Sequence, residues 1–105
     1  MAWLYLFSAG ILEIVWAFTM KQSDGFTRPM PTAITIVTMI GSFALLSLAM
    51  RSLPLGTAYT IWTGIGAVGA FVVGVTVLGE ALTPMRIAAA LLIVSGLVMM
   101  KLSAS

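Results

Sequence analysis

Residues 10–18 read GILEIVWAF and place Glu13 within a run of Ile, Leu, Val, Trp and Phe. The run belongs to an apolar stretch, residues 2–20, that is long enough to cross a bilayer as one helix, which needs about 20 residues. At about 1.5 Å per residue, Glu13 lies about 17 Å deep, near the midplane of a hydrocarbon core about 30 Å thick. A charge at that depth costs about 2.5 to 3.5 kcal/mol, so Glu13 is a functional candidate. A neutral Glu that donates one hydrogen bond is the structural alternative.

The composition of the whole chain agrees with a membrane protein. Of its 105 residues, 61% are hydrophobic and 8% are charged, whereas soluble domains carry about 25% charged residues. The chain has no cysteine and no histidine, which excludes disulfides, thiolate or histidine zinc sites and the usual catalytic triads. One buried acid without a base or a cofactor motif supports no enzyme chemistry, so we expect no cofactor and no metal. The net charge of +2 forms no basic cluster, which disfavours nucleic acid as a partner.

Charged residues and prolines divide the chain into four apolar segments, which we expect to form one all-α transmembrane domain over residues 1–105. The expected helices span about residues 2–20, 32–50, 57–78 and 85–100. The fourth segment is short for a spanning helix unless its ends snorkel. Open strands are excluded, because lipid cannot satisfy their backbone groups. The N-terminal residues lack a basic region, so we interpret them as a mature first helix and not as a cleaved signal peptide.

The positive charges are almost balanced between the two expected membrane sides. Four spans place Arg51 and Lys101 on the side of the termini, and Lys21, Arg28 and Arg86 on the other. Because excess Lys and Arg fix orientation, this small difference predicts a dual-topology protein that forms antiparallel homodimers. A single, weakly biased orientation is the alternative.

A chain with four helices needs a partner to seal a polar pathway from lipid. Small residues let membrane helices approach closely, and Ala89 and Gly96 lie seven positions apart in the fourth segment. We therefore expect these two residues to form the dimer contact. Packing within one subunit is the alternative interpretation.

The surroundings of Glu13 can be inferred from helical spacing. No basic residue lies inside the four apolar segments, so Glu13 is either protonated or binds a cation that is not part of the protein. Trp16 is one turn away and offers an indole N–H, and Gly10 leaves room beside the carboxylate. In the second segment, Ser42 is the deepest member of a hydroxyl stripe, although such hydroxyls often bond to their own helix.

The third segment contributes aromatic and small residues. Tyr59 and Trp62 share one helical face and either donate hydrogen bonds to the carboxylate or enclose a cation with their rings. Interface anchoring is the alternative for these aromatic residues. Glycines at three positions are expected to line the pocket or to let the helix flex: Gly64, Gly66 and Gly69.

Taken together, these residues resemble the small multidrug resistance family over essentially the whole chain. The resemblance depends on GILEIVWAFTMK (10–21), GFTRPMP (25–31), LPLGTAYTIWTGIGAVGA (53–70) and LGEALTPMR (78–86). Within that family the chain is similar to the guanidinium exporter subtype, whose binding residues map onto Glu13, Trp16, Ser42, Tyr59 and Trp62.

The resemblance implies a multi-pass protein of the bacterial inner membrane that exchanges protons for guanidinium or small guanidinyl cations. It also implies an antiparallel homodimer, and a relative of opposite orientation is the alternative partner. Protons and the planar cation would compete for the oxygens of Glu13 in both subunits. The alternative functions are a broad exporter of quaternary ammonium cations, a small dimeric ion channel, or a subunit of a larger membrane complex.

Overall fold

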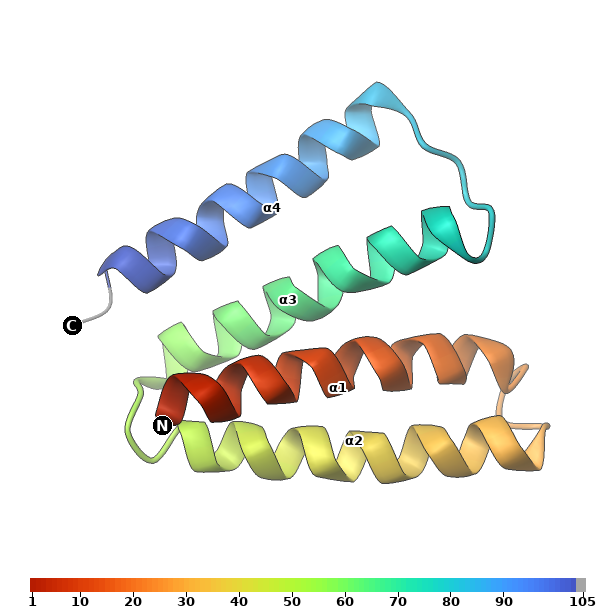
Figure 1. The fold of residues 1–105 in the computed structure, drawn as a ribbon, viewed down its shortest axis with the longest axis horizontal. Coiled ribbons are helices and arrows are strands. Elements are labelled where there is room, and N and C mark those ends of the chain that lie inside the picture. Colours follow the sequence, from red (N-terminus) through yellow and green to blue (C-terminus); the bar gives the residue numbers. More distant parts are fainter. Residues whose placement is uncertain (104–105) are drawn as a thin grey trace.

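A computed structural model describes residues 1–103 of the protein, and all regular secondary structure in this part of the chain is helical. The helices are α1 (Ala2–Gln22), α2 (Pro29–Ala49), α3 (Leu55–Thr76) and α4 (Pro84–Ser103) (Figure 1). Each has 20 to 22 residues and is apolar enough to cross a membrane. The prediction of an all-α chain with four membrane-spanning helices is confirmed.

Prolines mark where three of the helices begin. Pro29 and Pro84 are the first residues of α2 and α4, and Pro54 directly precedes α3. Proline suits a first turn, because its fixed φ is already helical and its missing N–H would have no partner there. The helix α4 continues past Lys101 to Ser103, so it has 20 residues and is not short. A Lys near a helix end keeps its charge in water by snorkelling, which is why the charge does not stop the helix.

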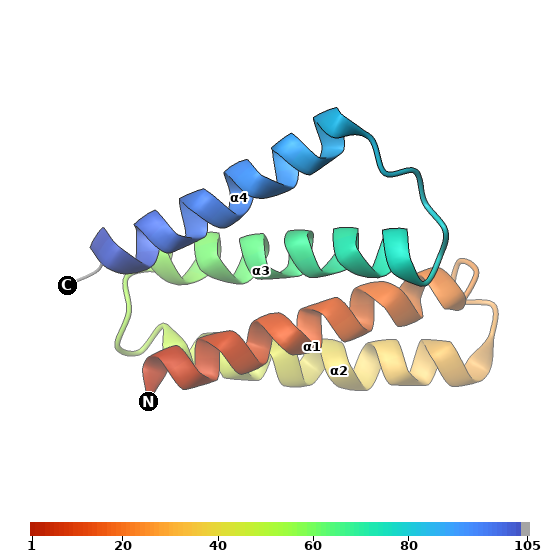
Figure 2. The ribbon, with the colours of Figure 1, turned by 45° about the horizontal axis from the view of Figure 1, so that its top comes forward.

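Three helices pack together and the fourth stands apart. The helix α1 packs against both α2 and α3, and the backbone of α4 comes close to α3 alone (Figures 1 and 2). From its C-terminal end, α4 diverges from α3 toward Pro84. The N-terminus and the α2–α3 loop lie at one end of the molecule, and the other two loops lie at the opposite end.

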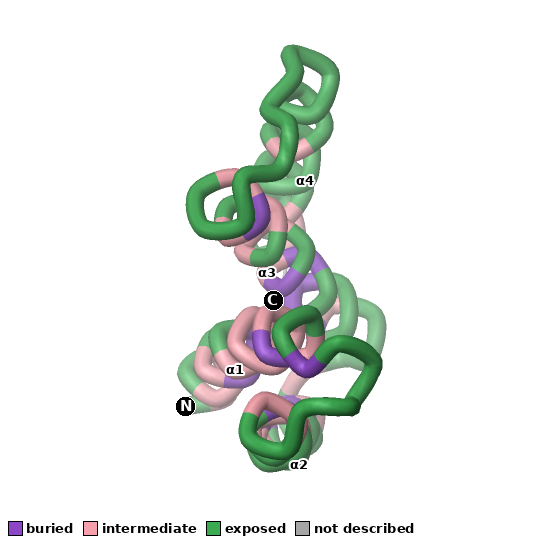
Figure 3. The backbone as a smooth tube through the Cα atoms, turned by 90° about the vertical axis from the view of Figure 1, so that its right-hand side faces the viewer, coloured by how far each residue is buried: buried purple, intermediate pink, exposed green. Residues whose placement is uncertain are grey.

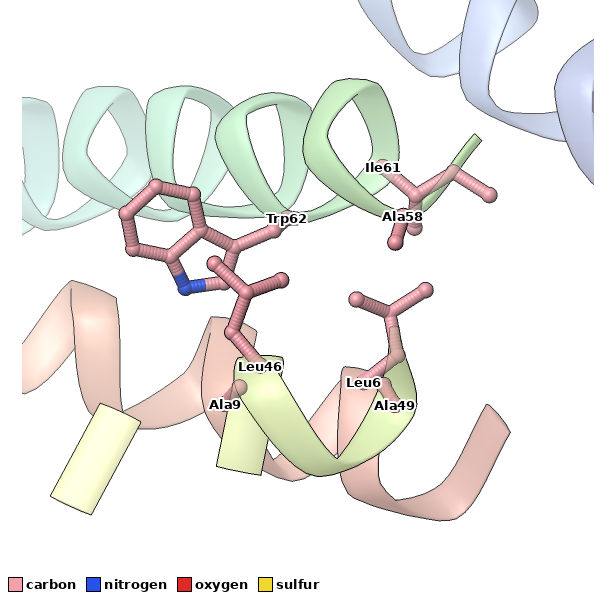
Figure 4. Close-up of a cluster of buried hydrophobic side chains, with 7 residues drawn as sticks. All are labelled: Leu6, Ala9, Leu46, Ala49, Ala58, Ile61 and Trp62. Carbon is pink, nitrogen blue, oxygen red and sulfur yellow. The ribbon is translucent and has the colours of Figure 1, made fainter. Parts of the chain in front are cut away.

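The hydrophobic core lies at the end of the molecule where α1 begins. It joins α1, α2 and α3, and three of its members are alanines, which let the helix backbones approach closely (Figure 4). Its buried side chains are Leu6, Ala9, Leu46, Ala49, Ala58, Ile61 and Trp62. This packing fixes α1, α2 and α3 relative to one another, and so positions the residues that follow one or two helical turns further along α1 and α3.

A hydroxyl pair joins α1 and α2 near their other ends. The Oγ1 atoms of Thr19 and Thr35 are buried and lie 2.7 Å apart, so one hydroxyl donates to the other. Thr35 also donates to the carbonyl of Pro31 at 2.8 Å, and Thr38 bonds to the carbonyl of Ile34 in its own helix at 2.7 Å. The hydroxyl stripe of α2 therefore serves mostly helix packing and backbone bonding, with Ser42 as the exception described below.

The molecule is thin and leaves much apolar surface uncovered. Its extents are 42 × 35 × 16 Å, and no residue of α4 is buried (Figure 3). Val37 on α2 and Leu92 on α4 are 68% and 73% exposed. Such side chains would be unfavourable in water, but they suit contact with lipid or with another membrane helix.

Candidate functional site

Glu13 lies in the middle of α1 and faces α3. Its carboxylate rests against Gly66, where even one added methyl group would overlap it. The carboxylate is half-buried, and its Oε1 atom is buried without a hydrogen-bond partner among residues 1–103. A buried carboxylate oxygen with no donor is costly, so this atom is available to a proton or to a cation from outside the protein.

Trp16 lies one turn from Glu13 on α1. Its indole Nε1 is also buried and also lacks a partner within the described part of the chain. Its ring meets Phe43 of α2 edge-on, with centroids 6.3 Å apart and an interplanar angle of 65°. An unsatisfied acceptor and an unsatisfied donor thus stand on neighbouring turns of one helix.

Ser42 connects all three packed helices through hydrogen bonds. Its hydroxyl donates to the backbone carbonyl of Ala9 on α1 at 2.7 Å and accepts the indole N–H of Trp62 on α3 at 3.0 Å. Ser42 is fully buried and Trp62 is 7% exposed. The N–H of Trp62 is therefore engaged by Ser42 and not by Glu13, so the ring face and not the N–H is what Trp62 offers to a ligand.

Tyr59 extends a chain of aromatic side chains from this network to the surface. The centroid of its ring lies 5.6 Å from that of Trp62 at an interplanar angle of 48°, and the ring centroid of Phe43 lies 5.7 Å from that of Trp62. Tyr59 is 52% exposed. We refer to these successive rings as the aromatic row, which consists of Trp16, Phe43, Trp62 and Tyr59. The sequence did not single out Phe43, because an apolar residue in a membrane helix gives no signal beyond its hydrophobicity.

The predicted glycines allow close approach between helices. Ile65 fills the space above Gly10, and Ile14 fills the space above Gly69, so both glycines bring α1 and α3 together. Gly64 faces the other way, where Leu97 of α4 covers it. The glycines therefore serve close packing in this structure, and flexing of α3 at these positions stays a prediction.

Ala89 and Gly96 both lie exposed on α4. A methyl group on Gly96 would meet no other atom, and Ala89 lines a cavity of about 130 Å³ between α3 and α4. The single chain therefore leaves both residues accessible, and the dimer contact stays a prediction.

The arrangement has the chemical features of a site for a small organic cation. One carboxylate supplies negative charge and an aromatic row supplies ring faces that attract cations. The missing side chain of Gly66 on α3 makes room for the carboxylate itself. Among residues 1–103, no three acidic, histidine or cysteine side chains come together to hold a metal ion.

Comparison with known proteins agrees with this picture. The sequence profile described as Small Multidrug Resistance protein matches residues 1–94. Relatives named guanidinium exporter, from Escherichia coli K12, Citrobacter freundii and Salmonella typhimurium, are each 54% identical over 103 residues. In each case the match covers 98% of both chains. This chain therefore belongs to the Small Multidrug Resistance protein family.

Proposed function

We propose that this protein exports guanidinium and small guanidinyl cations from bacteria across the inner membrane in exchange for protons. The observation that carries the proposal is the Glu13 carboxylate, with its unsatisfied oxygen in the middle of a membrane helix. The guanidinium exporters that are 54% identical over nearly the full chain support the choice of substrate.

The chemistry of Glu13 explains how one site couples two ions. A guanidinium ion is planar and presents parallel N–H donors that match the two oxygens of a carboxylate, and its faces stack on aromatic rings. A proton binds the same oxygens. Because Glu13 holds either the proton or the cation, inward movement of protons drives outward movement of the cation.

Trp16, Ser42, Tyr59 and Trp62 complete the proposed binding site. The Trp16 N–H is free to donate to the carboxylate or to a water beside it. Ser42 fixes the indole of Trp62, so that its ring keeps one orientation toward the cation. Tyr59 provides the outermost ring of the aromatic row and is placed to meet an entering ligand.

A second copy, inserted in the opposite orientation, completes the transporter in this proposal. A chain only 16 Å thick does not surround a polar path by itself. An antiparallel pair brings two Glu13 carboxylates to one cavity, and exchange of conformations between the subunits opens that cavity to alternate sides. Ala89 and Gly96 on the uncovered helix α4 are the proposed contact between copies.

The test is solid-supported membrane electrophysiology of purified protein in liposomes, with guanidinium across a range of pH. We expect guanidinium currents that depend on the proton gradient and disappear in Glu13→Gln, while Asp24→Asn, in the first loop, keeps them. Larger currents with tetramethylammonium than with guanidinium would instead indicate the quaternary ammonium exporter. Currents unchanged by Glu13→Gln would indicate a channel and reject the proposal.

A further inference from the structure

A cavity of about 310 Å³ opens where α1 and α3 end, apart from the aromatic row. Small residues of the two helices line it, together with three charged side chains: Lys21 of α1, Glu80 of the α3–α4 loop and Arg86 of α4. Its lining residues are Ala17, Phe18, Lys21, Ala67, Ala70, Phe71, Val73, Gly74, Leu78, Glu80 and Arg86.

Two alanines that line this outer cavity lie one helical turn beyond the Glu13 site. Ala17 follows Glu13 by four positions on α1, and Ala70 follows Gly66 by four positions on α3. Residues four apart lie on the same helix face, about one turn of 5.4 Å along the axis. Glu13 and Gly66 contact each other across α1 and α3. One turn further along each of these helices, an alanine lines the outer cavity.

Arg86, one of the residues that line the outer cavity, brings a guanidinium group of its own to it. The Arg86 Cζ atom lies 5.8 Å from the ring centroid of Phe71, and its Nη1 donates to the carbonyl of Ala81 at 2.9 Å. These are the two kinds of contact that a free guanidinium ion makes, stacking on an aromatic face and donation to an oxygen.

The Glu80 carboxylate supplies the negative charge of the outer cavity. The backbone N–H of Glu80 donates to the carbonyl of Gly74 at 2.9 Å, which fixes this part of the α3–α4 loop. The carboxylate of Glu80 lies directly against Gly74. A methyl group on Gly74 would overlap the carboxylate oxygen. The missing side chain at Gly74 therefore lets Glu80 lie over the end of α3.

We infer that the outer cavity is a second guanidinium-binding site, formed by Phe71, Glu80 and the Ala81 carbonyl, at which the Arg86 side chain is a tethered competitor. This inference deepens the proposed function, on which it rests for the role of the site. A guanidinium ion would wait here on its way to or from Glu13. Arg86 is exposed and long enough to turn its charge toward water when the ion takes its place. Lys21 is also exposed and can turn its charge toward water in the same way.

The experiment measures ligand binding by saturation-transfer NMR, with methylguanidinium as the probe because its methyl protons do not exchange with water. All proteins carry Glu13→Gln, which removes the carboxylate of the inner site. Adding Arg86→Ala is expected to strengthen methylguanidinium binding about fivefold, the size expected when one exposed cation–π contact stops competing. Adding Glu80→Gln or Phe71→Leu to that protein is expected to abolish the gain.

Two control variants test whether the effect belongs to the Arg86 side chain. Arg51→Ala removes a positive charge at the opposite end of the molecule and is expected to leave binding unchanged. Arg86→Lys keeps the charge but loses the planar group, and it is expected to strengthen binding as well. Binding that is unchanged by Arg86→Ala, or that rises with Arg86→Ala but not with Arg86→Lys, overturns the inference.

The outcome is separable from that of the proposed function. If guanidinium currents of the unaltered protein were absent, the transport proposal would fail, although the Arg86-dependent binding could still be found. If currents depended on Glu13 while no Arg86 variant altered binding, only the second site would be rejected. Each protein is compared by circular dichroism and gel filtration first, and Phe71→Leu serves where Glu80→Gln does not fold.

Discussion

At the scale of single residues, the position of Glu13 depends on a side chain that is missing from the opposite helix. The carboxylate occupies the space beside Gly66 that any other residue would fill. The indole of Trp62 is held differently, by a hydrogen bond from its N–H to the hydroxyl of Ser42. Two small residues thus set the geometry of a charged group and of a large ring.

The contact between Gly66 and Glu13 leads to a first prediction. Gly66→Ala is expected to lower guanidinium affinity about tenfold or more, because overpacking a tight contact costs about 1 to 3 kcal/mol. Gly56→Ala, at a helical glycine with open space around it, is the matched control and is expected to keep the affinity. Guanidinium titrations of the transport current measure both. Equal affinities in the two variants would contradict the close contact.

The hydrogen bond between Trp62 and Ser42 leads to a second prediction. Ser42→Ala leaves the Trp62 N–H without its acceptor in a buried place, which costs about 1 to 3 kcal/mol. We expect weaker guanidinium binding and a shift in tryptophan fluorescence. Ser47→Ala, at an exposed serine of the same helix, should show neither. A Ser42→Ala protein with unaltered fluorescence and affinity would show that the bond is unimportant for the site.

At the scale of helices, the chain separates into a packed unit and an arm. The helices α1, α2 and α3 share the core, whereas α4 is attached near its C-terminal end. The attachment includes Leu97, which covers Gly64, and Lys101, whose Nζ lies 4.8 Å from the ring centroid of Trp3. The N-terminal half of α4 diverges from α3, as Figures 1 and 2 show.

The attachment of α4 leads to a third prediction. Leu97→Ala is expected to lower the free energy of unfolding in SDS by about 2 kcal/mol or more, since it removes the side chain that covers Gly64. Leu92→Ala is the matched control, because Leu92 is 73% exposed, and its effect should stay within about 0.5 kcal/mol. If the two substitutions lower the free energy of unfolding by the same amount, Leu97 does not hold α4 to the packed unit.

At the scale of the whole molecule, the charge distribution and the shape both bear on orientation. The α2–α3 loop and the C-terminal end of α4 lie at one end of the molecule and carry Arg51 and Lys101. The opposite end holds the other two loops and the helix ends beside them, which carry Lys21, Arg28 and Arg86. The difference of one positive charge gives little preference for either orientation. The thin shape and the uncovered helix α4 leave room for an inverted copy to pack against this one.

The nearly balanced charges lead to a fourth prediction. Because the chain has no cysteine, Ser52→Cys places a single thiol in the α2–α3 loop. A membrane-impermeant maleimide is expected to label about half of the molecules from each side, as two equally populated orientations require. Thr27→Cys, at the opposite end, should give the same result. Labelling of the two sites from opposite sides only would establish a single orientation.

The sequence by itself determined the class of the fold and indicated the central residue of the candidate site. Few charges in a long apolar chain indicate a membrane protein, and a helix satisfies the backbone of each long apolar segment inside lipid. One acid inside these segments stands out because its cost in lipid is high. Helical spacing also selected Trp16, because residues one turn apart on a helix are neighbours whatever the rest of the chain does.

Only the tertiary structure decided which helices meet and which side chains face one another. Phe43 in the aromatic row, Gly66 beneath Glu13 and the Ser42–Trp62 bond join separate helices, and such contacts depend on the rotation and crossing of each helix. Apart from the acid on α1, these helices are apolar on most of their surface, so hydrophobicity alone does not indicate which face turns inward. That choice rests on close packing of small residues and on a few buried hydrogen bonds, which exist only once the helices are side by side.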